Sequence, residues 1–172
     1  MASLYSLSPG PNPPEVVHVV VEIPKGGRNK YEYDPARGMF VLDRVLYSAV
    51  HYPAEYGFIP GTLADDGDAI DVLVMTTQPT FTGCLLEARP VGMLRMRDEK
   101  GEDEKVLAVP TADPNYDGIR ELAHIAPHFL REVEHFFRVY KDLERKAVET
   151  FGWEPRGVAE RTITAAIAAA AK

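Results

Sequence analysis

Short runs of β-branched and apolar residues, separated by glycine, proline and aspartate, fill the first two-thirds of the 172-residue chain. This pattern predicts short strands joined by turns, which is typical of a small barrel or sandwich. The segment 52–61 carries two prolines and two glycines among aromatic residues, and it predicts an ordered loop with an edge strand. The other strands are expected at 16–23, 30–33, 39–45, 70–77, 85–96 and 106–110.

The spacing of the apolar residues changes in the final third of the chain. Between residues 127 and 145 they recur every three to four positions, which predicts an amphipathic helix, and Pro127 suits its first turn. A second, alanine-rich helix is expected over 159–171, after a loop at 151–157. The sequence therefore predicts an α+β fold in which helices pack against the outside of a β barrel.

Composition narrows the classes of function. Acidic residues outnumber basic residues by 26 to 19, and the net charge of −7 argues against nucleic acid or an anionic membrane as a partner. The single cysteine, Cys84, cannot form an internal disulfide and fits a reducing compartment. We find neither a signal-peptide pattern nor an apolar run of about 20 residues that could span a bilayer. We therefore expect a cytoplasmic protein with a flexible N-terminal arm over 1–14 and a single domain over 15–172.

Four aspartates lie within seven residues, directly before a predicted strand: Asp65, Asp66, Asp68 and Asp71. Two such carboxylates about 4 Å apart would repel each other by about 4 kcal/mol at an effective dielectric constant of ~20. They must therefore point into water, share protons or bind cations. The spacing does not fit a calcium-binding EF-hand loop, because Asp71 would occupy its glycine position. For this segment alone, a solvated acidic turn and a cation site both stay open.

A second acidic turn, at 98–103, joins two predicted strands, so that Asp98 and Asp103 can point to the same side. Alone it is typical of a charged hairpin tip, but two acidic turns at the ends of barrel strands could bind several hard cations such as Mg²⁺. Other side chains could donate hydrogen bonds to phosphate oxygens. These are Lys30, Arg44, Tyr52, Tyr56, Lys105, Tyr140 and Lys141.

Each of these donors also has an ordinary structural explanation. Arg44 could pair with Asp43 or with another surface acid. Tyr140 falls on the apolar face of the predicted helix, where packing is the usual role, and Lys141 beside it would ordinarily be solvated. Core packing would likewise explain Tyr52 and Tyr56.

The segment Asp66-Gly67-Asp68-Ala69-Ile70-Asp71-Val72 is similar to the signature D-x-D-[P/E]-x-D-x, from which it departs at Ala69. Together with the other segments that match in order, it closely resembles the family I soluble inorganic pyrophosphatases of the bacterial type. The resemblance covers roughly residues 15–155, which is far more specific than one motif. The other matching segments are 21–24, 30–32, 43–44, 52–53, 55–57, 90–92, 98–105 and 136–144.

This resemblance implies an OB-like small β barrel with flanking C-terminal helices, and hydrolysis of inorganic diphosphate to two phosphates by Mg²⁺-activated water. Mn²⁺ or other divalent ions would be substitutes, and a homo-oligomer, usually a hexamer, is implied. The implied metal ligands are Asp66, Asp71, Asp98, Asp103 and Glu32. Asp68 would accept the proton of the attacking water, with Glu22 and Tyr52 supporting the site. The implied phosphate contacts are Lys30, Arg44, Tyr56, Lys105, Tyr140 and Lys141.

Three other functions compete with this interpretation. A barrel that binds single-stranded nucleic acid would need a basic groove with stacking aromatic residues, whereas aspartates surround the expected barrel mouth here. A calcium-binding structural protein would not need the lysines and tyrosines. Another metal-dependent phosphohydrolase, acting on nucleotides or organic phosphates, stays open. A zinc site is disfavoured, because His124 and His128 do not form a His-Glu-x-x-His pattern.

Overall fold

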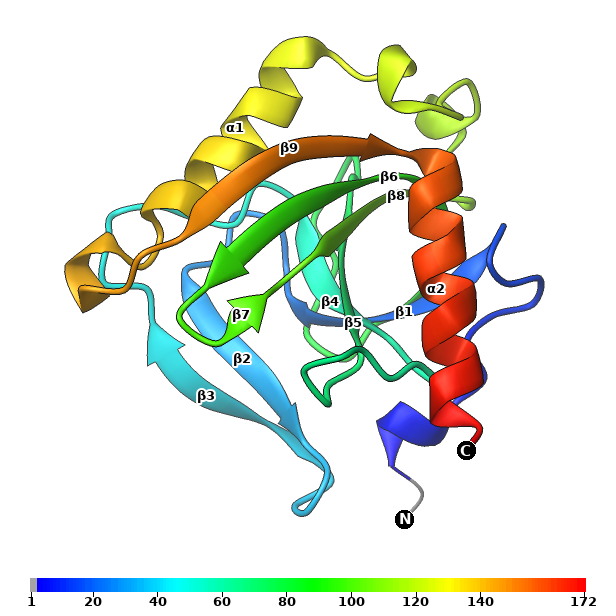
Figure 1. Ribbon diagram of the computed structural model, residues 1–172, viewed down its shortest axis with the longest axis horizontal. Coiled ribbons are helices and arrows are strands. Elements are labelled where there is room, and N and C mark those ends of the chain that lie inside the picture. Colours follow the sequence, from blue (N-terminus) through cyan, green and yellow to red (C-terminus); the bar gives the residue numbers. More distant parts are fainter. Residues whose placement is uncertain (1–2) are drawn as a thin grey trace.

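The computed structural model describes residues 3–172, and this range forms nine β-strands and two α-helices (Figure 1). The helices are α1 (Pro127–Val139) and α2 (Arg156–Ala170), neither of which is long and apolar enough to cross a membrane. The strands are β1 (Val17–Ile23), β2 (Asn29–Asp34), β3 (Met39–Val45), β4 (Glu55–Ile59), β5 (Ile70–Val74), β6 (Leu85–Asp98), β7 (Gly101–Glu102), β8 (Lys105–Pro110) and β9 (Glu149–Pro155).

Five strands close into a ring in the order β1, β4, β5, β8, β6 and back to β1. Within this ring β5 and β8 run parallel, and the other neighbours run antiparallel. β9 pairs with β6 outside the ring, and β7 forms a short hairpin with the end of β6. β2 and β3 form a separate two-stranded sheet, which extends to the lower left in Figure 1. The ring and the C-terminal helices confirm the predicted α+β fold class.

The two helices cover different sides of the ring, and ring strands such as β8 are therefore buried on both faces. Successive side chains of a strand point to opposite faces. Along β8, Leu107 and Val109 join the apolar cluster that contains the buried side chains of α1, whereas Val106 and Ala108 join the cluster that contains those of α2. In Figure 1, α1 lies above the sheet and α2 runs along its right side.

The segment 52–61 differs from its sequence prediction. Instead of an edge strand, β4 lies inside the ring between β1 and β5, and all five of its residues are buried. Gly57 makes this close approach feasible, because a Cβ atom there would lie 1.9 Å from the backbone oxygen of Val20. A glycine in a strand interior often marks such a contact between two backbones.

The C-terminal third differs from its prediction in two places. The segment 151–157 was expected to be a loop, but Glu149–Pro155 forms β9 and covers the edge of β6. The first helix ends at Val139 rather than at residue 145 and is followed by a 3₁₀ turn, Asp142–Glu144. Arg145 then adopts a left-handed conformation (φ 58°), which stops any further helical turn.

The predicted flexible arm, 1–14, begins with two residues outside the part of the chain that the structure describes. From Leu4 onward the segment contacts the rest of the fold. The amide of Leu4 donates a hydrogen bond to the Tyr33 hydroxyl (3.1 Å), and the ring of Tyr5 packs against Tyr33 and Phe58. The flexibility of this arm and the domain boundary at residue 15 stay predictions.

Candidate active site

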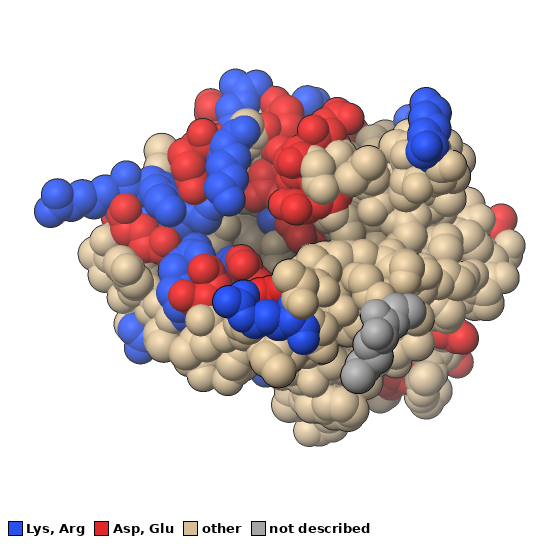
Figure 2. Space-filling model, turned by 90° about the horizontal axis from the view of Figure 1, so that it is seen from below, with Lys and Arg blue, Asp and Glu red and all other residues tan. Residues whose placement is uncertain are grey.

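A cavity of about 260 Å³ lies at one end of the ring, beside the β2–β3 hairpin. Figure 2 shows Asp and Glu side chains together with Lys and Arg side chains around a hollow on this side of the molecule. Of the predicted site residues, Arg44 and Tyr52 do not line the cavity. The others do: Glu22, Lys30, Glu32, Tyr56, Asp66, Asp68, Asp71, Asp98, Asp103, Lys105, Tyr140 and Lys141.

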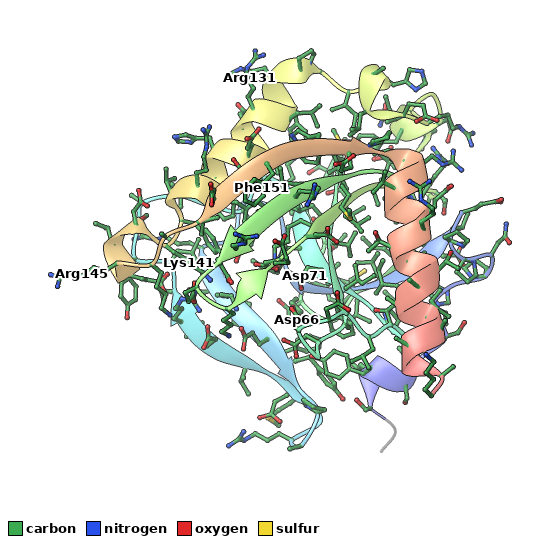
Figure 3. The ribbon with its side chains drawn as sticks, viewed as in Figure 1. Asp66, Asp71, Arg131, Lys141, Arg145 and Phe151 are labelled. Atoms are coloured by element: carbon green, nitrogen blue, oxygen red, sulfur yellow. The ribbon has the colours of Figure 1, made fainter. Side chains whose placement is uncertain are left out.

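The parallel pairing of β5 and β8 brings the two acidic turns together. Val72 of β5 pairs with Val106 of β8, so Asp71 and Lys105, one residue earlier on each strand, are neighbours at the strand starts. The turn that holds Asp66 and Asp68 directly precedes β5, and Asp103 lies two residues before Lys105. Figure 3 shows Asp66 and Asp71 near the centre of the view, below the ribbons of β6 and β8.

Lys105 lies at the bottom of this cluster with its side chain only 3% exposed. Its ammonium nitrogen lies 2.5 Å from Asp71 Oδ2 and 2.6 Å from Asp103 Oδ1, and it donates a hydrogen bond to the Tyr56 hydroxyl at 3.0 Å. Burial opposes the charged form, but Asp71, Tyr56, Asp103 and Tyr140 together outweigh it and keep the pKa of Lys105 well above its ordinary value. Lys105 is therefore a fixed, buried positive charge.

Lys141 supplies a second cation from the residues that follow α1. Its Nζ atom lies 2.9 Å from Asp98 Oδ2 and 3.3 Å from Glu99 Oε2. Burial opposes the charge here as well, but Tyr140 and Asp98 raise the pKa of Lys141 above its ordinary value. At Asp98 burial is outweighed by the hydrogen bonds from Lys141 and from the Lys100 amide together with the charges of the nearby lysines, and the pKa of that carboxyl is lowered. Both partners are therefore charged.

Burial and neighbouring carboxylates raise the pKa values of three other acids in the cavity. Burial, followed by repulsion from Asp66 and Asp71, raises the pKa of Asp68. Burial and repulsion from Asp71 raise the pKa of Asp103 despite the nearby Lys105. Burial also raises the pKa of Glu22 to about 7, although its carboxylate accepts a hydrogen bond from a backbone amide. Additional positive charge in the cavity, beyond that of its own lysines, would therefore stabilise these carboxylates in their charged form.

This donor set fits hard divalent cations. The carboxylate oxygens at the mouth are the ligands that Mg²⁺ prefers. Within residues 3–172, no group of three or more His, Cys, Asp or Glu side chains is already gathered in the geometry of a metal site. Instead the Lys105 ammonium lies between Asp71 and Asp103 and occupies the position of a cation between them. The carboxylates at this position thus already surround a positive charge.

Two predicted site residues lie outside the cavity. Arg44 contacts Asp43 through Nη1, and its Nε atom lies 2.9 Å from Glu144 Oε1. The alternative role considered for Arg44, an ion pair with Asp43 or another acid, is therefore present in the structure. Tyr52 is 1% exposed, and its ring centroid lies 5.1 Å from that of Tyr56. Tyr52 is thus a core residue behind the cavity wall.

Sequence reasoning missed several residues around the site. Glu99 contacts Lys141, and Glu144 contacts Arg44. The spacing of Glu144 from Tyr140, one helical turn, is a signal that could have placed it on the same side. The missed residues that line the cavity are Tyr5, Phe58, Ala69, Lys100 and Glu102.

The hydroxyl groups of the lining tyrosines complete the chemistry of the cavity. Burial raises the pKa of Tyr56 and of Tyr140, so both remain protonated and can donate hydrogen bonds. Ammonium and phenol donors thus share one cavity with several carboxylates. Such an arrangement can bind a small polyanion together with divalent cations.

Comparison with known proteins gives a consistent result. The family model described as inorganic pyrophosphatase matches residues 19–171. An inorganic pyrophosphatase from Synechocystis is 52% identical over 139 residues, which are 81% of this chain and 82% of that protein. One from Thermus thermophilus is 48% identical over 171 residues, which are 98% of each chain.

Solved structures agree with these matches. The crystal structure of inorganic pyrophosphatase from Thermus thermophilus superimposes with a TM-score of 0.98 at 46% identity, over 99% of this chain and 100% of that chain. The inorganic pyrophosphatase from Helicobacter pylori gives a TM-score of 0.89 at 41% identity, over 92% and 95%. The chain therefore belongs to the inorganic pyrophosphatase family.

Proposed function

We propose that this protein hydrolyses inorganic diphosphate to two phosphates with the help of Mg²⁺. One observation carries the proposal: a single cavity joins both acidic turns to Lys105, Lys141 and the hydroxyl groups of Tyr56 and Tyr140. A densely anionic substrate would be repelled by a protein of net charge −7. Carboxylates that gather divalent cations reverse the sign of the local field, and the donors then bind the phosphate oxygens.

The acidic residues divide into two groups in this proposal. Asp66, Asp71 and Asp103 would hold the ions that activate water, and Asp98 and Glu32 would hold further ions. When bound, divalent ions would make water a stronger acid near neutral pH and would neutralise phosphate charge. Mn²⁺ or other divalent ions of similar ligand preference would be substitutes.

Asp68 is the proposed general base. It lies between two proposed metal ligands, Asp66 and Asp71, and lines the same cavity. Its raised pKa makes its carboxylate a better proton acceptor than an ordinary aspartate. Asp68 would accept the proton of the attacking water, and Glu22 would support the site from the side of β1.

The basic and phenolic residues hold the substrate and the leaving phosphate. Lys105 and Lys141 are permanent charges at the cavity wall, and Lys30 lines it from the β2–β3 hairpin. Hydrogen bonds from these ammonium groups, and from Tyr56 and Tyr140, would neutralise charge that grows on the leaving group. Arg44 would add a bidentate contact, and Tyr52 would keep the ring of Tyr56 in place.

We also propose that the enzyme works in the cytoplasm as a homo-oligomer, a hexamer as in the bacterial type that its sequence resembles. A single cysteine supports a reducing compartment. Exposed apolar side chains on β3, such as Leu42 and Val45, support contacts between copies. Light scattering coupled to size-exclusion chromatography tests the state, and a monomeric mass at micromolar concentration would contradict it.

The decisive experiment measures phosphate release from diphosphate and from a nucleoside triphosphate, each with and without Mg²⁺. We expect rapid release from diphosphate, little from the triphosphate, and none from either when a chelator removes the metal. Preferential hydrolysis of the triphosphate would instead favour another metal-dependent phosphohydrolase.

A further inference from the structure

The backbone of Arg44 lies next to a residue that lines the cavity, but the Arg44 side chain is not part of the cavity lining. On the β2–β3 hairpin it is paired directly with Lys30, which lines the cavity. Directly paired residues place their side chains on the same face of a two-stranded sheet. Two carboxylates, Asp43 and Glu144, contact the guanidinium instead. The contact with Glu144 also links the hairpin to the segment that follows α1 and holds Lys141.

The two carboxylates differ in burial and in the atoms they contact. The Glu144 side chain is 6% exposed and lies 2.9 Å from Arg44 Nε, at the inner end of the guanidinium. The Asp43 side chain is 34% exposed and contacts Nη1, at the outer end. Asp43 also lies 3.7 Å from the ammonium of Lys30, so it can keep a cationic neighbour without Arg44.

The buried contact is close but poorly aligned. Arg44 Nε and Glu144 Oε2 are both buried and lack hydrogen-bond partners of good geometry. A buried carboxylate with an unused oxygen is destabilising, and a native protein that keeps one needs a reason for it. An ion pair that is held by charge rather than by an aligned hydrogen bond also allows the guanidinium to rotate.

We propose that Glu144 is a positioning residue, which anchors Arg44 at Nε while a phosphate of the substrate replaces Asp43 at the outer nitrogens. A guanidinium has five N–H donors, so an anchor at Nε leaves enough of them for a bidentate phosphate contact. Asp43 occupies the outer nitrogens until the substrate arrives. The inference rests on the proposed function, because it assigns Arg44 to diphosphate.

Simple electrostatics and this proposal predict different results. Removal of either negative charge beside Arg44 should favour an anionic substrate if charge alone matters. Under our proposal the two carboxylates act in opposite directions: loss of Asp43 frees Arg44 for phosphate, whereas loss of Glu144 leaves the guanidinium without its anchor.

The test compares Glu144→Gln with Asp43→Asn, two matched changes from acid to amide, at saturating Mg²⁺. We expect Glu144→Gln to raise KM for diphosphate about 10-fold with kcat within about threefold, which is the pattern of lost ground-state binding. Asp43→Asn should lower KM. Glu144→Asp, which keeps the charge, should lie between the wild type and Glu144→Gln. Glu132→Gln, the same change on the exposed face of α1, should alter neither constant.

A second measurement separates positioning from a general structural role. In an Arg44→Ala background, Glu144→Gln should cause no further change in KM, because its effect acts through Arg44. Calorimetric titration with inorganic phosphate should show weaker binding by Glu144→Gln but not by Glu132→Gln, with melting temperatures as a check on folding.

Two results would overturn the inference: a KM for Glu144→Gln that falls as it does for Asp43→Asn, or an effect of Glu144→Gln that persists without Arg44. A wild-type enzyme that released no phosphate from diphosphate would overturn the proposed function instead. The phosphate titration would then still decide whether Glu144 positions Arg44.

Discussion

Partial burial, together with the like charges of Asp66 and Asp71 on either side, raises the pKa of Asp68. Asp68→Asn keeps the size of the side chain but removes the proposed base. We expect kcat to fall by about 10²–10⁴-fold, the usual contribution of a general base, while the Mg²⁺ concentration for half-maximal activity changes less. Steady-state rates over a range of Mg²⁺ concentrations measure both. Asp65→Asn, an exposed aspartate of the same turn, is the matched control. A near-normal kcat for Asp68→Asn would reduce Asp68 to a structural role.

Glu22 makes the stability of the fold depend on pH. Burial raises its pKa to about 7 in the folded protein, against an ordinary value of 4.5. Between these values the folded protein keeps a proton that the unfolded chain has released. The free energy of unfolding therefore falls as pH rises from 4.5 to 7, by an amount on the order of 3 kcal/mol, and this contribution is constant above pH 7.

Glu22→Gln removes this titration and keeps an oxygen that can accept the hydrogen bond from the Tyr33 amide. We expect its stability relative to the wild type to increase steadily from pH 4.5 to pH 7. Urea unfolding in the presence of a chelator, at several pH values, measures the difference and keeps metal binding out of it. Parallel pH curves for the two proteins would show that Glu22 does not titrate in this range.

Among the elements, the contact between β4 and β1 depends on the absence of a side chain at Gly57. Gly57→Ala would place a Cβ atom 1.9 Å from the Val20 oxygen, and backbone atoms cannot give way as a flexible side chain can. We expect a loss of stability on the order of 3 kcal/mol or failure to fold. Gly118→Ala, where a Cβ atom would meet nothing within 4 Å, should stay close to the wild type. Thermal unfolding of both variants makes the comparison, and a Gly57→Ala protein as stable as Gly118→Ala would contradict it.

The elements also show how far the sequence predicts this fold. β1, which is dense in β-branched residues, and β3, a run of apolar residues after a turn, were placed to within a residue, because their local pattern is strong. β9 was missed because Gly152 and Pro155 interrupt its pattern, and its strand conformation depends on pairing with the distant β6. β4 was placed at an edge for a similar reason, since Gly57 weakens the local signal but allows the tight packing.

The candidate site, like the fold, could be predicted where it depends on local sequence and not where it depends on contacts between distant residues. The two acidic turns were predicted to meet because the strands next to them belong to one barrel, and Asp71 and Asp103 do lie on either side of Lys105. The position of Arg44 could not be predicted, because its contact with Glu144 joins residues a hundred positions apart. Local pattern places the donors near the cavity, and tertiary contacts decide which of them line it.

At the scale of the whole molecule, the net charge of −7 is concentrated in part around one cavity, where burial and, after it, repulsion between carboxylates raise the pKa values of Asp68 and Asp103. Ions that bind this cavity in the folded state but not the unfolded chain stabilise the fold by mass action. At a free Mg²⁺ concentration 100-fold above the dissociation constant the gain is about 2.7 kcal/mol. For a chain of this length, that corresponds to a rise of roughly 5–10 °C in melting temperature.

We therefore expect the addition of Mg²⁺ to chelator-treated protein to raise the melting temperature and to restore hydrolysis of diphosphate over the same range of concentration. NaCl at matched ionic strength separates binding from screening, because screening acts on all surface charges alike. Asp71→Asn, which removes one proposed ligand, should shift both curves to higher Mg²⁺ concentration. Turnover that continued in excess chelator, or a melting temperature that responded equally to NaCl, would mean that these carboxylates do not gather metal, and the substrate would then have to be bound by the lysines alone.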